Sequence, residues 1–589
     1  MQGRRLDWVR TAALAMLALA APPARAQVAY EAQVSRDAPK AAVPGRTSMV
    51  VSANPIATAA GREIIDAGGS AVDAAIAMQL VLGIVEPQSQ GIGGGGFLLT
   101  FDAASREITS FDGRETAPAS ATPALFLDAD GKQRPFPQGY VGGHTVGVPG
   151  MLRMMEMAHR RHGKLAWVRL FQPAIRIATD GFAISPRLNA ALTSARDIAR
   201  QFPAMHSHYY QADGTPKPVG TVLRNPELAQ LLREIATGGA DAYYVGPAAA
   251  RAATAISTAP LSPVPVTAAD FAGYRAIERP AVCGGYRVYT VCSMGPPSSG
   301  ATTLLGELKM LERFDLKALG PTSPQAVHLI AEATALAFAD REMYLADPAF
   351  AEVPVAGLTD PGYLRGRGRL IDPDKAGPPA TAGTPPGLVQ SAWAPGRSAD
   401  LPSTSHWAVV DKAGNAATFT GSIQSGFGSF IMVDGYLLNN ELTDFAMRPE
   451  ANGTPVINRA EAGKRPLSSM SPTLVFDDQG RLVLALGSAG GSRIIGHVLK
   501  TVVGVLDWGL DVQQAISLPN LHGDNPRIEV EAGTPLEALT PALEAMGHTV
   551  VTRANISGLT GIQVVHDADG AAHYLGGVDP RREGIASGD

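Results

Sequence analysis

The chain has little charge, few aromatic side chains and almost no cysteine. Charged residues make up 17% of its 589 residues, below the roughly 25% of average soluble domains, whereas hydrophobic residues make up 45%. This balance favours extensive burial and argues against a disordered chain. Because the net charge is −5 and no Lys/Arg-rich stripe is present, the composition does not favour nucleic acid as a partner. No long linker divides the chain, so we expect one large composite body.

After the N-terminal segment, no stretch of the chain reaches the length of about 20 apolar residues that is needed to cross a bilayer. The N-terminus has Arg4-Arg5, an apolar run over Thr11–Ala21, and Ala24-Arg25-Ala26. This layout is typical of a secretory signal. We therefore expect residues 1–26 to be a signal peptide and the mature chain to start near Gln27. A periplasmic or secreted location follows, with no membrane contact after the signal is removed.

The cysteines are Cys283 and Cys292, both in the strand-like run Ala281–Met294. They can pair in an oxidising compartment, or they can be two small buried hydrophobic residues. The sequence leaves both interpretations open. Neither cysteine has neighbours typical of a metal site or a catalytic thiol.

Thr404 is the most informative residue. Residues 373–403 are rich in Pro, Gly, Ala and Thr, which is typical of a mobile connection, and they lead directly to Thr404 and an apolar strand from Trp407. A Thr at the start of a strand is usually structural. If the bond after Ser403 were cut, however, Thr404 would carry a free α-amino group beside its Oγ, and one residue would supply nucleophile and base. An α-amino group titrates near 7.7–8.0 and is partly neutral at pH 7.

The first half of the chain predicts tightly packed elements. Asn54 is expected to cap a helix from Pro55, and Ser70 to open a second, Ala-rich helix through about Val85. The glycine block Gly91–Gly96 resembles a phosphate cradle, but a strand follows it and no Gly-Lys-Ser/Thr is present. We interpret the block as close backbone packing. Further along, the charged residues around Asp340-Arg341 are expected to form structural pairs.

Several motifs recur in an order that resembles a known family. Upstream is Asp112-Gly113-Arg114-Glu115; downstream of Thr404 are Gly426-Phe427-Gly428-Ser429, Leu437-Leu438-Asn439-Asn440-Glu441, Lys464–Thr473 and Gly487–Arg493. Their order and spacing resemble the γ-glutamyltransferases (glutathione hydrolases), which are N-terminal nucleophile hydrolases. The resemblance extends from about Met49 to Gly588.

The resemblance implies a fold and a maturation step. The fold would be a four-layer αββα sandwich of the α/β (α+β) class, with two central antiparallel sheets. Attack of Thr404 on the preceding carbonyl would cut the chain between Ser403 and Thr404. The large subunit (27–403) and the small subunit (404–589) would remain together as a heterodimer. The implied chemistry needs no metal and no organic cofactor.

It also implies roles for single residues. Ser422 would hydrogen-bond the nucleophile, and the backbone N–H groups of Gly490 and Gly491 would stabilise the oxyanion, because glycine lets the chain approach closely. The same two glycines would also suit a simple turn, so both interpretations stand.

A γ-glutamyl group carries an α-carboxylate and an α-ammonium, so its pocket needs two sets of partners. We expect Arg114, Ser468 and Ser469 to bind the carboxylate. The ammonium would be bound by Glu441, Asp444 and the carbonyl of Gln424. The alternative for the two acids is an exposed pair, which the apolar residues around them disfavour.

Two departures from the family pattern bear on specificity. Ser422-Ile423-Gln424 replaces the usual Thr-x-Asn, and Ala446–Gly463 has no aromatic residue where many members carry a Tyr-bearing lid. The resemblance implies γ-glutamyl amide cleavage, with glutathione as the default substrate and water, an amino acid or a peptide as acceptor. The alternatives are an amidase for glutaryl or cephalosporin side chains or for polyglutamate, and a catalytically silent secreted binding protein.

Overall fold

The computed structural model describes residues 40–388, 393–398, 401–524, 526–554, 557–567 and 570–589. The expected signal peptide, residues 1–26, lies outside these ranges. Within them, no helix has both the length and the apolar character needed to cross a bilayer.

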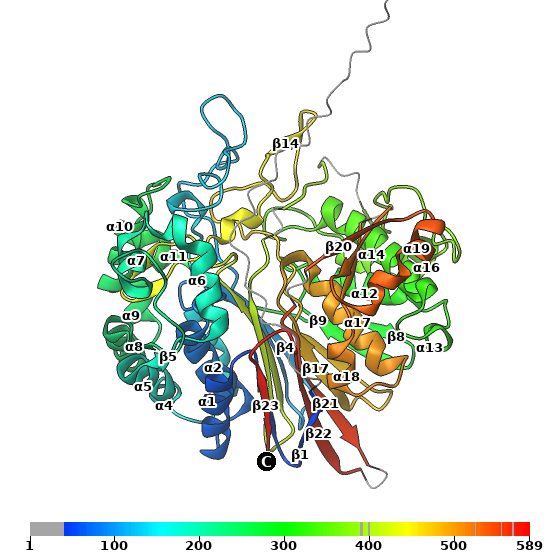
Figure 1. Ribbon diagram of the computed structural model, residues 1–589, viewed down its shortest axis with the longest axis horizontal. Helices are drawn as coiled ribbons and strands as arrows, with labels where there is room; N and C mark the ends of the chain where they lie inside the picture. Colours follow the sequence, from blue (N-terminus) through cyan, green and yellow to red (C-terminus); the bar gives the residue numbers. More distant parts are fainter. Residues whose placement is uncertain (1–39, 389–392, 399–400, 525, 555–556, 568–569) are drawn as a thin grey trace, which may run out of the picture.

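Two seven-stranded antiparallel sheets lie face to face at the centre of the molecule (Figure 1). The order of the first sheet is β23 (Ile585–Gly588), β2 (Met49–Ser52), β10 (Ser405–Val410), β11 (Ala416–Ser422), β3 (Gly95–Phe101), β4 (Ile108–Asp112) and β7 (Ile277–Arg279). The order of the second is β1 (Val43–Gly45), β22 (Ala572–Val578), β21 (Thr560–His566), β17 (Leu482–Gly487), β16 (Thr473–Phe476), β9 (Tyr289–Ser293) and β8 (Val282–Tyr286).

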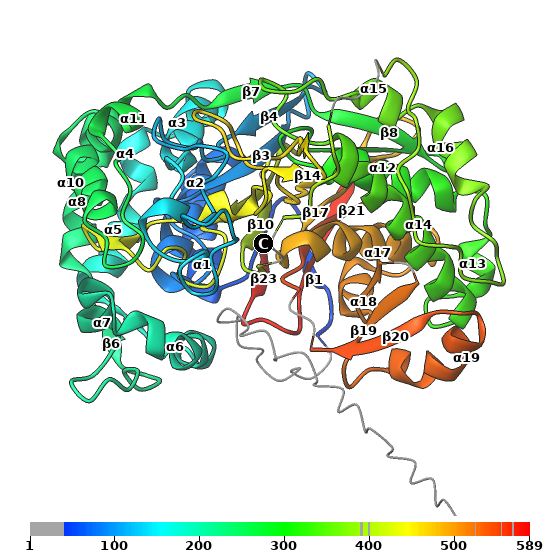
Figure 2. The same cartoon turned by 90° about the horizontal axis from the view of Figure 1, so that it is seen from above.

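Helices cover the outer face of each sheet, as Figures 1 and 2 show from two directions. Over the first sheet lie α1 (Pro55–Asp66), α2 (Ala71–Val85), α3 (Met151–His162), α4 (Trp167–Leu170), α5 (Gln172–Asp180), α6 (Pro186–Ala199), α7 (Pro203–Tyr209), α8 (Pro226–Gly238), α9 (Asp241–Tyr244), α10 (Pro247–Ser257) and α11 (Ala268–Gly273). Over the second lie α12 (Gly300–Leu311), α13 (Leu316–Leu319), α14 (Pro324–Tyr344), α15 (Val355–Leu358), α16 (Pro361–Gly368), α17 (Ile494–Leu506), α18 (Val512–Ser517) and α19 (Thr540–Ala545).

Shorter elements complete the chain. They are the strand pairs β5 (Phe182–Ala183) with β6 (Val222–Leu223), β12 (Met432–Val433) with β13 (Tyr436–Leu437) and β14 (Glu450–Ala451) with β15 (Thr454–Pro455), the small sheet β18 (Leu521–Asp524), β19 (Arg527–Glu531) and β20 (Thr549–Arg553), and the 3₁₀ turns Gly143–Thr145, Glu441–Asp444, Gly491–Arg493 and Pro535–Leu539.

The strand sequences explain the layering. Successive side chains of a strand point to opposite faces, so in β10 Val409 packs in the core shared with α2, whereas Val410 packs in the core between the two sheets. Every residue of β10 and β11 is buried, because both faces of the first sheet are covered. The expected αββα sandwich with antiparallel sheets is confirmed.

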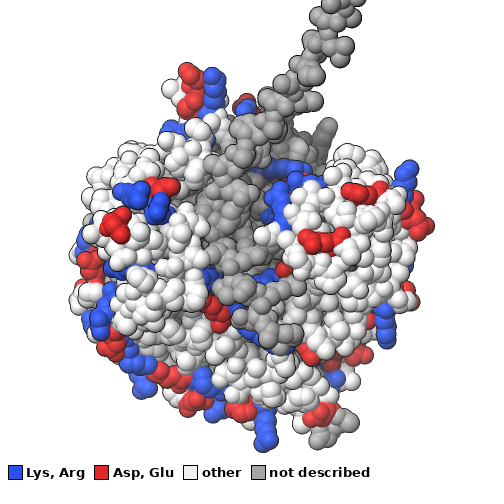
Figure 3. All heavy atoms as spheres, in the orientation of Figure 1, with Lys and Arg blue, Asp and Glu red and all other residues white. Residues whose placement is uncertain are grey.

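The predicted helices and strands agree closely with the structure. The helices expected from Pro55 and Ser70 are α1, capped by Asn54, and α2, capped by Ser70. On the face shown in Figure 3, acidic and basic side chains are interspersed over both helical layers.

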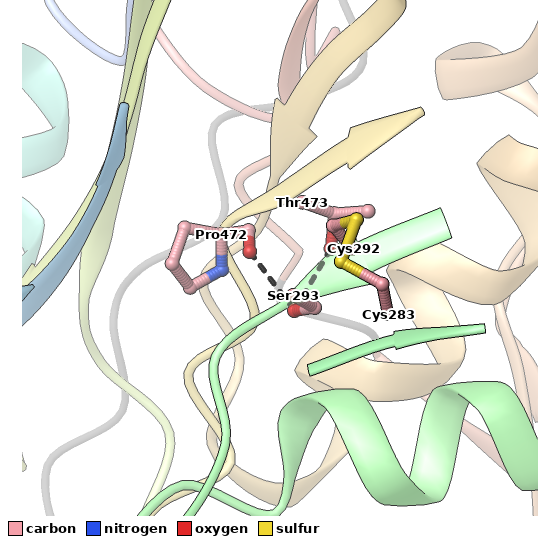
Figure 4. Close-up of a disulfide and its surroundings, with 5 residues drawn as sticks. All are labelled: Cys283, Cys292, Ser293, Pro472 and Thr473. Atoms are coloured by element: carbon pink, nitrogen blue, oxygen red, sulfur yellow. Dashed lines mark hydrogen bonds between the residues drawn. A yellow bond between two sulfur atoms is a disulfide. The ribbon is translucent and has the colours of Figure 1, made fainter. Parts of the chain in front are cut away.

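The two cysteines form a disulfide. Cys283 in β8 lies opposite Cys292 in β9, and the bond joins these two strands at the edge of the second sheet (Figure 4). Cys283 is exposed and Cys292 is buried. The alternative of two buried hydrophobic residues is therefore wrong.

We expect the purified protein to take up no thiol-alkylating label when denatured without a reductant, and two labels after reduction. Intact mass spectrometry measures both states. The double substitution Cys283→Ser, Cys292→Ser is expected to lower the free energy of unfolding by about 2–3 kcal/mol, because a short loop loses its closure. Labelling before reduction would contradict the disulfide.

Candidate active site

Thr404 lies at the start of β10 in a backbone conformation that threonine rarely adopts. Its φ is +96°, in the left-handed half of the map, where a β-branched residue is an outlier. Such a conformation costs about 1–3 kcal/mol and persists only where the surroundings enforce it. The residue is 4% exposed. The structure thus holds strain at the Ser403–Thr404 junction.

Hydrogen bonds hold this junction from several sides. The Gly490 N–H donates to the Ser403 carbonyl at 3.2 Å, and the Ser403 hydroxyl donates to the Gln88 carbonyl at 3.0 Å. Arg582 donates from Nη1 to the Thr404 carbonyl at 2.9 Å. Gly490 itself has a φ of +130°, which glycine adopts without strain. The carbonyl that Thr404 would attack therefore already faces an N–H donor.

Ser422 faces the Thr404 hydroxyl across the hairpin. Ser405 pairs with Gly421 in the β10–β11 register, so the next position places Thr404 opposite Ser422. Thr404 Oγ1 donates to Ser422 Oγ at 3.1 Å, and Ser422 Oγ also accepts the Gln424 N–H at 2.8 Å. The hairpin thus fixes the direction of the Thr404 hydroxyl.

The glycine block Gly91–Gly96 packs closely against this hairpin. A Cβ on Gly94 would lie 2.0 Å from the Ser422 carbonyl oxygen, and one on Gly93 would lie 2.2 Å from the Leu437 carbonyl oxygen. Only a residue without a side chain allows these contacts. The expected close backbone packing is confirmed, and it positions the strand end that carries Ser422.

Arg114 lies buried just after β4, between the two predicted acids. It forms ion pairs with Glu441 and Asp444, and it donates to the carbonyls of Pro466 at 3.0 Å and Leu467 at 2.9 Å. We had expected Arg114 and the acids to form two separate sets of ligands. In the structure the three side chains pair with one another, because an unpaired charge at such depth is very costly. Their roles as substrate ligands stay predictions.

The acid cluster consists of the single base Arg114 and three acids, Glu115, Glu441 and Asp444. Glu115, which the sequence did not single out, is buried 3.8 Å from the Arg114 guanidinium. Among the described residues, neither of its carboxyl oxygens has a hydrogen-bond partner, and neither has Glu441 Oε2. Burial and the neighbouring Glu441 raise the pKa of Glu115 well above its usual range. Burial also raises the pKa of Glu441 to about 7, against the opposing effect of Arg114.

Gln424 reaches the same cluster with its side chain. Its Nε2 donates to Asp444 Oδ1 at 2.6 Å, and its φ is +80°. Gln424 therefore joins the Thr404–Ser422 pair to the acids, through its backbone on one side and its side chain on the other. Its carbonyl was the group expected to face an ammonium; the amide nitrogen is what meets Asp444.

Ser468 and Ser469 lie beside the cluster with different partners. Ser468 Oγ accepts the Met470 N–H at 3.1 Å. Ser469 Oγ accepts a hydrogen bond from Arg341 Nη2 at 2.9 Å. The expected structural pairing holds for Asp340, which pairs with Arg367 at 3.2 Å. A structural pair does not fully describe Arg341. Its guanidinium also donates to Ser469, one of the predicted carboxylate ligands.

The segment before Thr404 crosses the cluster. Ser398 Oγ donates to the Asp444 carbonyl at 2.7 Å, and Ala394 N–H donates to the Pro455 carbonyl of β15 at 2.8 Å. The hairpin β14–β15 belongs to Ala446–Gly463, the stretch without an aromatic residue. In the intact chain, its own residues thus lie where a substrate would approach Asp444.

A family model for gamma-glutamyltranspeptidase matches residues 57–589. The chain is 36% identical to the glutathione hydrolase proenzyme of Escherichia coli (strain K12) over 580 residues, which cover 96% of this chain and 95% of that one. The chain belongs to the gamma-glutamyltranspeptidase family. The resemblance drawn from the motifs is confirmed.

Acylases are similar to this gamma-glutamyltranspeptidase family member to the same degree. The acylase ACY 1 proenzyme of Pseudomonas sp. (strain SE83) is 36% identical over 526 residues, with 87% of this chain and 89% of that one covered. The crystal structure of cephalosporin acylase from Bacillus halodurans superposes with a TM-score of 0.82 at 25% identity, covering 94% of this chain and 98% of that one. The fold is that of the N-terminal nucleophile hydrolases.

We expect Gly94→Ala to slow any reaction at Thr404 by about 100-fold, because the new Cβ displaces the end of β11 and moves Ser422 away from Thr404. Self-cutting and amide hydrolysis, followed by gel and by chromogenic assay, measure the effect. Gly366→Ala is the matched control, since a Cβ there meets nothing within 4 Å. Equal rates in both variants would contradict this packing role.

Proposed function

We propose that this protein is a self-processing γ-glutamyl hydrolase and transferase that uses Thr404 as its N-terminal nucleophile. The observation that carries the proposal is the junction itself. Thr404 is strained at φ +96°, its hydroxyl is directed by Ser422, and the preceding carbonyl accepts the Gly490 N–H. These are the parts that an intramolecular attack requires.

The processing step moves one bond at a time. Thr404 Oγ attacks the Ser403 carbonyl carbon, the Ser403–Thr404 amide bond breaks, and an ester to Oγ replaces it. The Gly490 N–H stabilises the oxyanion formed during this shift, and the conformational strain is released. Water then hydrolyses the ester, which leaves a carboxylate on Ser403 and a free amine and hydroxyl on Thr404.

The freed residue then performs acyl transfer. Its amine accepts the Oγ proton while Oγ attacks the γ-carbonyl of the substrate, and the protonated amine gives that proton to the departing amine. Gly490, with Gly491 beside it, stabilises the oxyanion. Water or an acceptor amine next attacks the γ-glutamyl ester and regenerates Thr404.

The acid cluster supports an amino acid as the acyl group. Glu441 and Asp444 outnumber Arg114, so a substrate ammonium supplies the counter-charge that the cluster lacks. Arg114 and Arg341, with Ser468 and Ser469, provide the donors for the α-carboxylate. Glutathione satisfies both requirements and is the default substrate.

We propose that maturation also gives a substrate access to the acid cluster. Once residue 403 is a free end, residues 394–403 can leave Asp444 and the hairpin β14–β15. The products 27–403 and 404–589 stay together, because each central sheet contains strands from both sides of the cut. We propose export through the signal at residues 1–26 and a periplasmic or secreted location.

A second candidate is a glutaryl or cephalosporin acylase of the same fold. The similarity to the acylase ACY 1 proenzyme and to the cephalosporin acylase structure favours it, as do Gln424 and the lid region without an aromatic residue. Turnover of a γ-glutamyl anilide against a glutaryl anilide separates the two, since the glutaryl group lacks the ammonium.

We expect intact mass spectrometry of the purified protein to find a subunit that begins at Thr404. Thr404→Ala should remain uncut and lose more than about 1000-fold in γ-glutamyl anilide hydrolysis, because both nucleophile and base are removed. Thr404→Ser is the matched control, since it keeps the hydroxyl and the amine and should still cut itself. An intact Ser403–Thr404 bond in an active enzyme would refute the mechanism.

We expect inhibition by L-glutamate to strengthen by about tenfold from pH 6 to pH 8, because Glu441, with its pKa of about 7, becomes ionised over this range and can pair with the ammonium. Glutarate, which has no ammonium, should not show this gain. The inhibition constants of both compounds measure the effect, and Glu441→Gln should abolish the difference. A pH-independent ratio of the two constants would show that Glu441 does not bind the ammonium.

A further inference from the structure

A buried histidine pair lies outside the site just described. His328 and Glu332 are one helical turn apart near the start of α14, so their side chains share one face of that helix. His548 comes from the turn between α19 and β20 and packs against them. Their side-chain donor atoms all lie within 4.8 Å of one another. All three residues are buried, with exposures of 0%, 3% and 5%.

Backbone carbonyls fix which nitrogens of the pair carry protons. His328 Nε2 lies 2.7 Å from the Asp372 carbonyl, and His548 Nδ1 lies 3.3 Å from the Pro526 carbonyl. A carbonyl oxygen only accepts, so each of these nitrogens must be the N–H donor. In a neutral imidazole the other nitrogen then carries a lone pair.

The two lone pairs point at each other. His328 Nδ1 and His548 Nε2 are 2.7 Å apart, which is a bonding distance for a pair that has no proton between them when both rings are neutral. A carboxyl oxygen of Glu332 lies 4.0 Å from His548 Nε2. A cation bound among these three atoms would accept both imidazole lone pairs and contact the Glu332 carboxylate.

The distances suit a tetrahedral metal ion. Bonds of about 2.1 Å at tetrahedral angles place ligand atoms about 3.4 Å apart. The observed separations of 2.7 Å and 4.0 Å lie on either side of this value, so small side-chain rotations satisfy it. Carbonyls that orient the outer imidazole nitrogens are the usual second layer of partners around metal-bound histidine.

We propose that His328, Glu332 and His548 bind a zinc ion that stabilises the fold. Two imidazoles and one carboxylate form a ligand set typical of Zn²⁺. The ion would join α14 to the β18–β20 sheet and α19, in addition to a small hydrophobic cluster that includes Val327 and Ile528 and the ring contact between Phe338 and His522. It would also connect a residue after Thr404 with two residues before it.

The site is distinct from the acid cluster. His328 and Arg341 are 13 positions apart on α14, which corresponds to about 20 Å along the helix axis. The zinc ion would therefore contribute to stability rather than to acyl transfer. Its test does not depend on the substrate of the enzyme.

The experiment measures metal content and stability of the full-length protein. We expect about one zinc ion per chain by elemental analysis after incubation with ZnCl₂ and gel filtration. Dialysis against a chelator should lower the melting temperature by about 4 °C or more, and zinc should restore it. Cobalt(II) added to the metal-free protein should give the visible absorption of a tetrahedral site.

His548→Gln should lose the bound metal and the response to the chelator. His573→Gln is the matched control, since His573 lies outside the group of three and pairs with Asp567 at 3.5 Å, and this variant should keep both properties. Retention of zinc by a folded His548→Gln variant would overturn the proposal. The wild type alone also decides it, because a wild-type protein that binds neither zinc nor cobalt refutes a metal site even if the variant fails to fold.

Discussion

The conformation of one peptide unit organises the active site. Thr404 stays at φ +96° because its own carbonyl is held by Arg582, the preceding carbonyl by Gly490, and its hydroxyl by Ser422. These three partners come from different parts of the fold: Arg582 lies in the turn between β22 and β23, Gly490 directly before the 3₁₀ turn Gly491–Arg493, and Ser422 at the end of β11. Strain of about 1–3 kcal/mol can persist only with such support. The surrounding sandwich therefore maintains this strained conformation next to the aligned Thr404 hydroxyl.

The same support ties maturation to specificity. Ser422 and Gln424 lie at the end of β11; the first directs the nucleophile and the second holds Asp444. The block Gly93–Gly96 fixes this strand end through contacts that leave no room for a side chain. A change in the position of β11 thus affects the Thr404 hydroxyl and the acid cluster together. Acylases with similar sequences retain the fold, so specificity has to reside in the few side chains that contact the acyl group.

Helices and strands could be predicted from the sequence more accurately than the contacts between buried charged side chains. The caps of α1 and α2 and the apolar strand from Trp407 follow from local patterns, and the structure agrees. Local patterns carry no information about which buried charges meet. Arg114 lies between Glu441 and Asp444, more than 320 residues away in sequence, and no local pattern predicts this contact. Arg341, whose helix packs against a different sheet, was missed for the same reason.

Both the acid cluster and the histidine pair consist of buried titratable side chains. The two sites differ in their access to solvent, and this difference separates their roles. At the acid cluster, Asp444 keeps 17% of its side chain exposed, and Ser398 of the segment before Thr404 donates to its carbonyl. A cation that enters there can leave again, as a substrate must. At the histidine pair, the three ligands are at most 5% exposed and are enclosed by α14, α19 and β20. A cation bound there exchanges slowly with solvent, because its release requires these elements to separate. Depth of burial is therefore consistent with the two proposed roles, turnover at the first site and stability at the second.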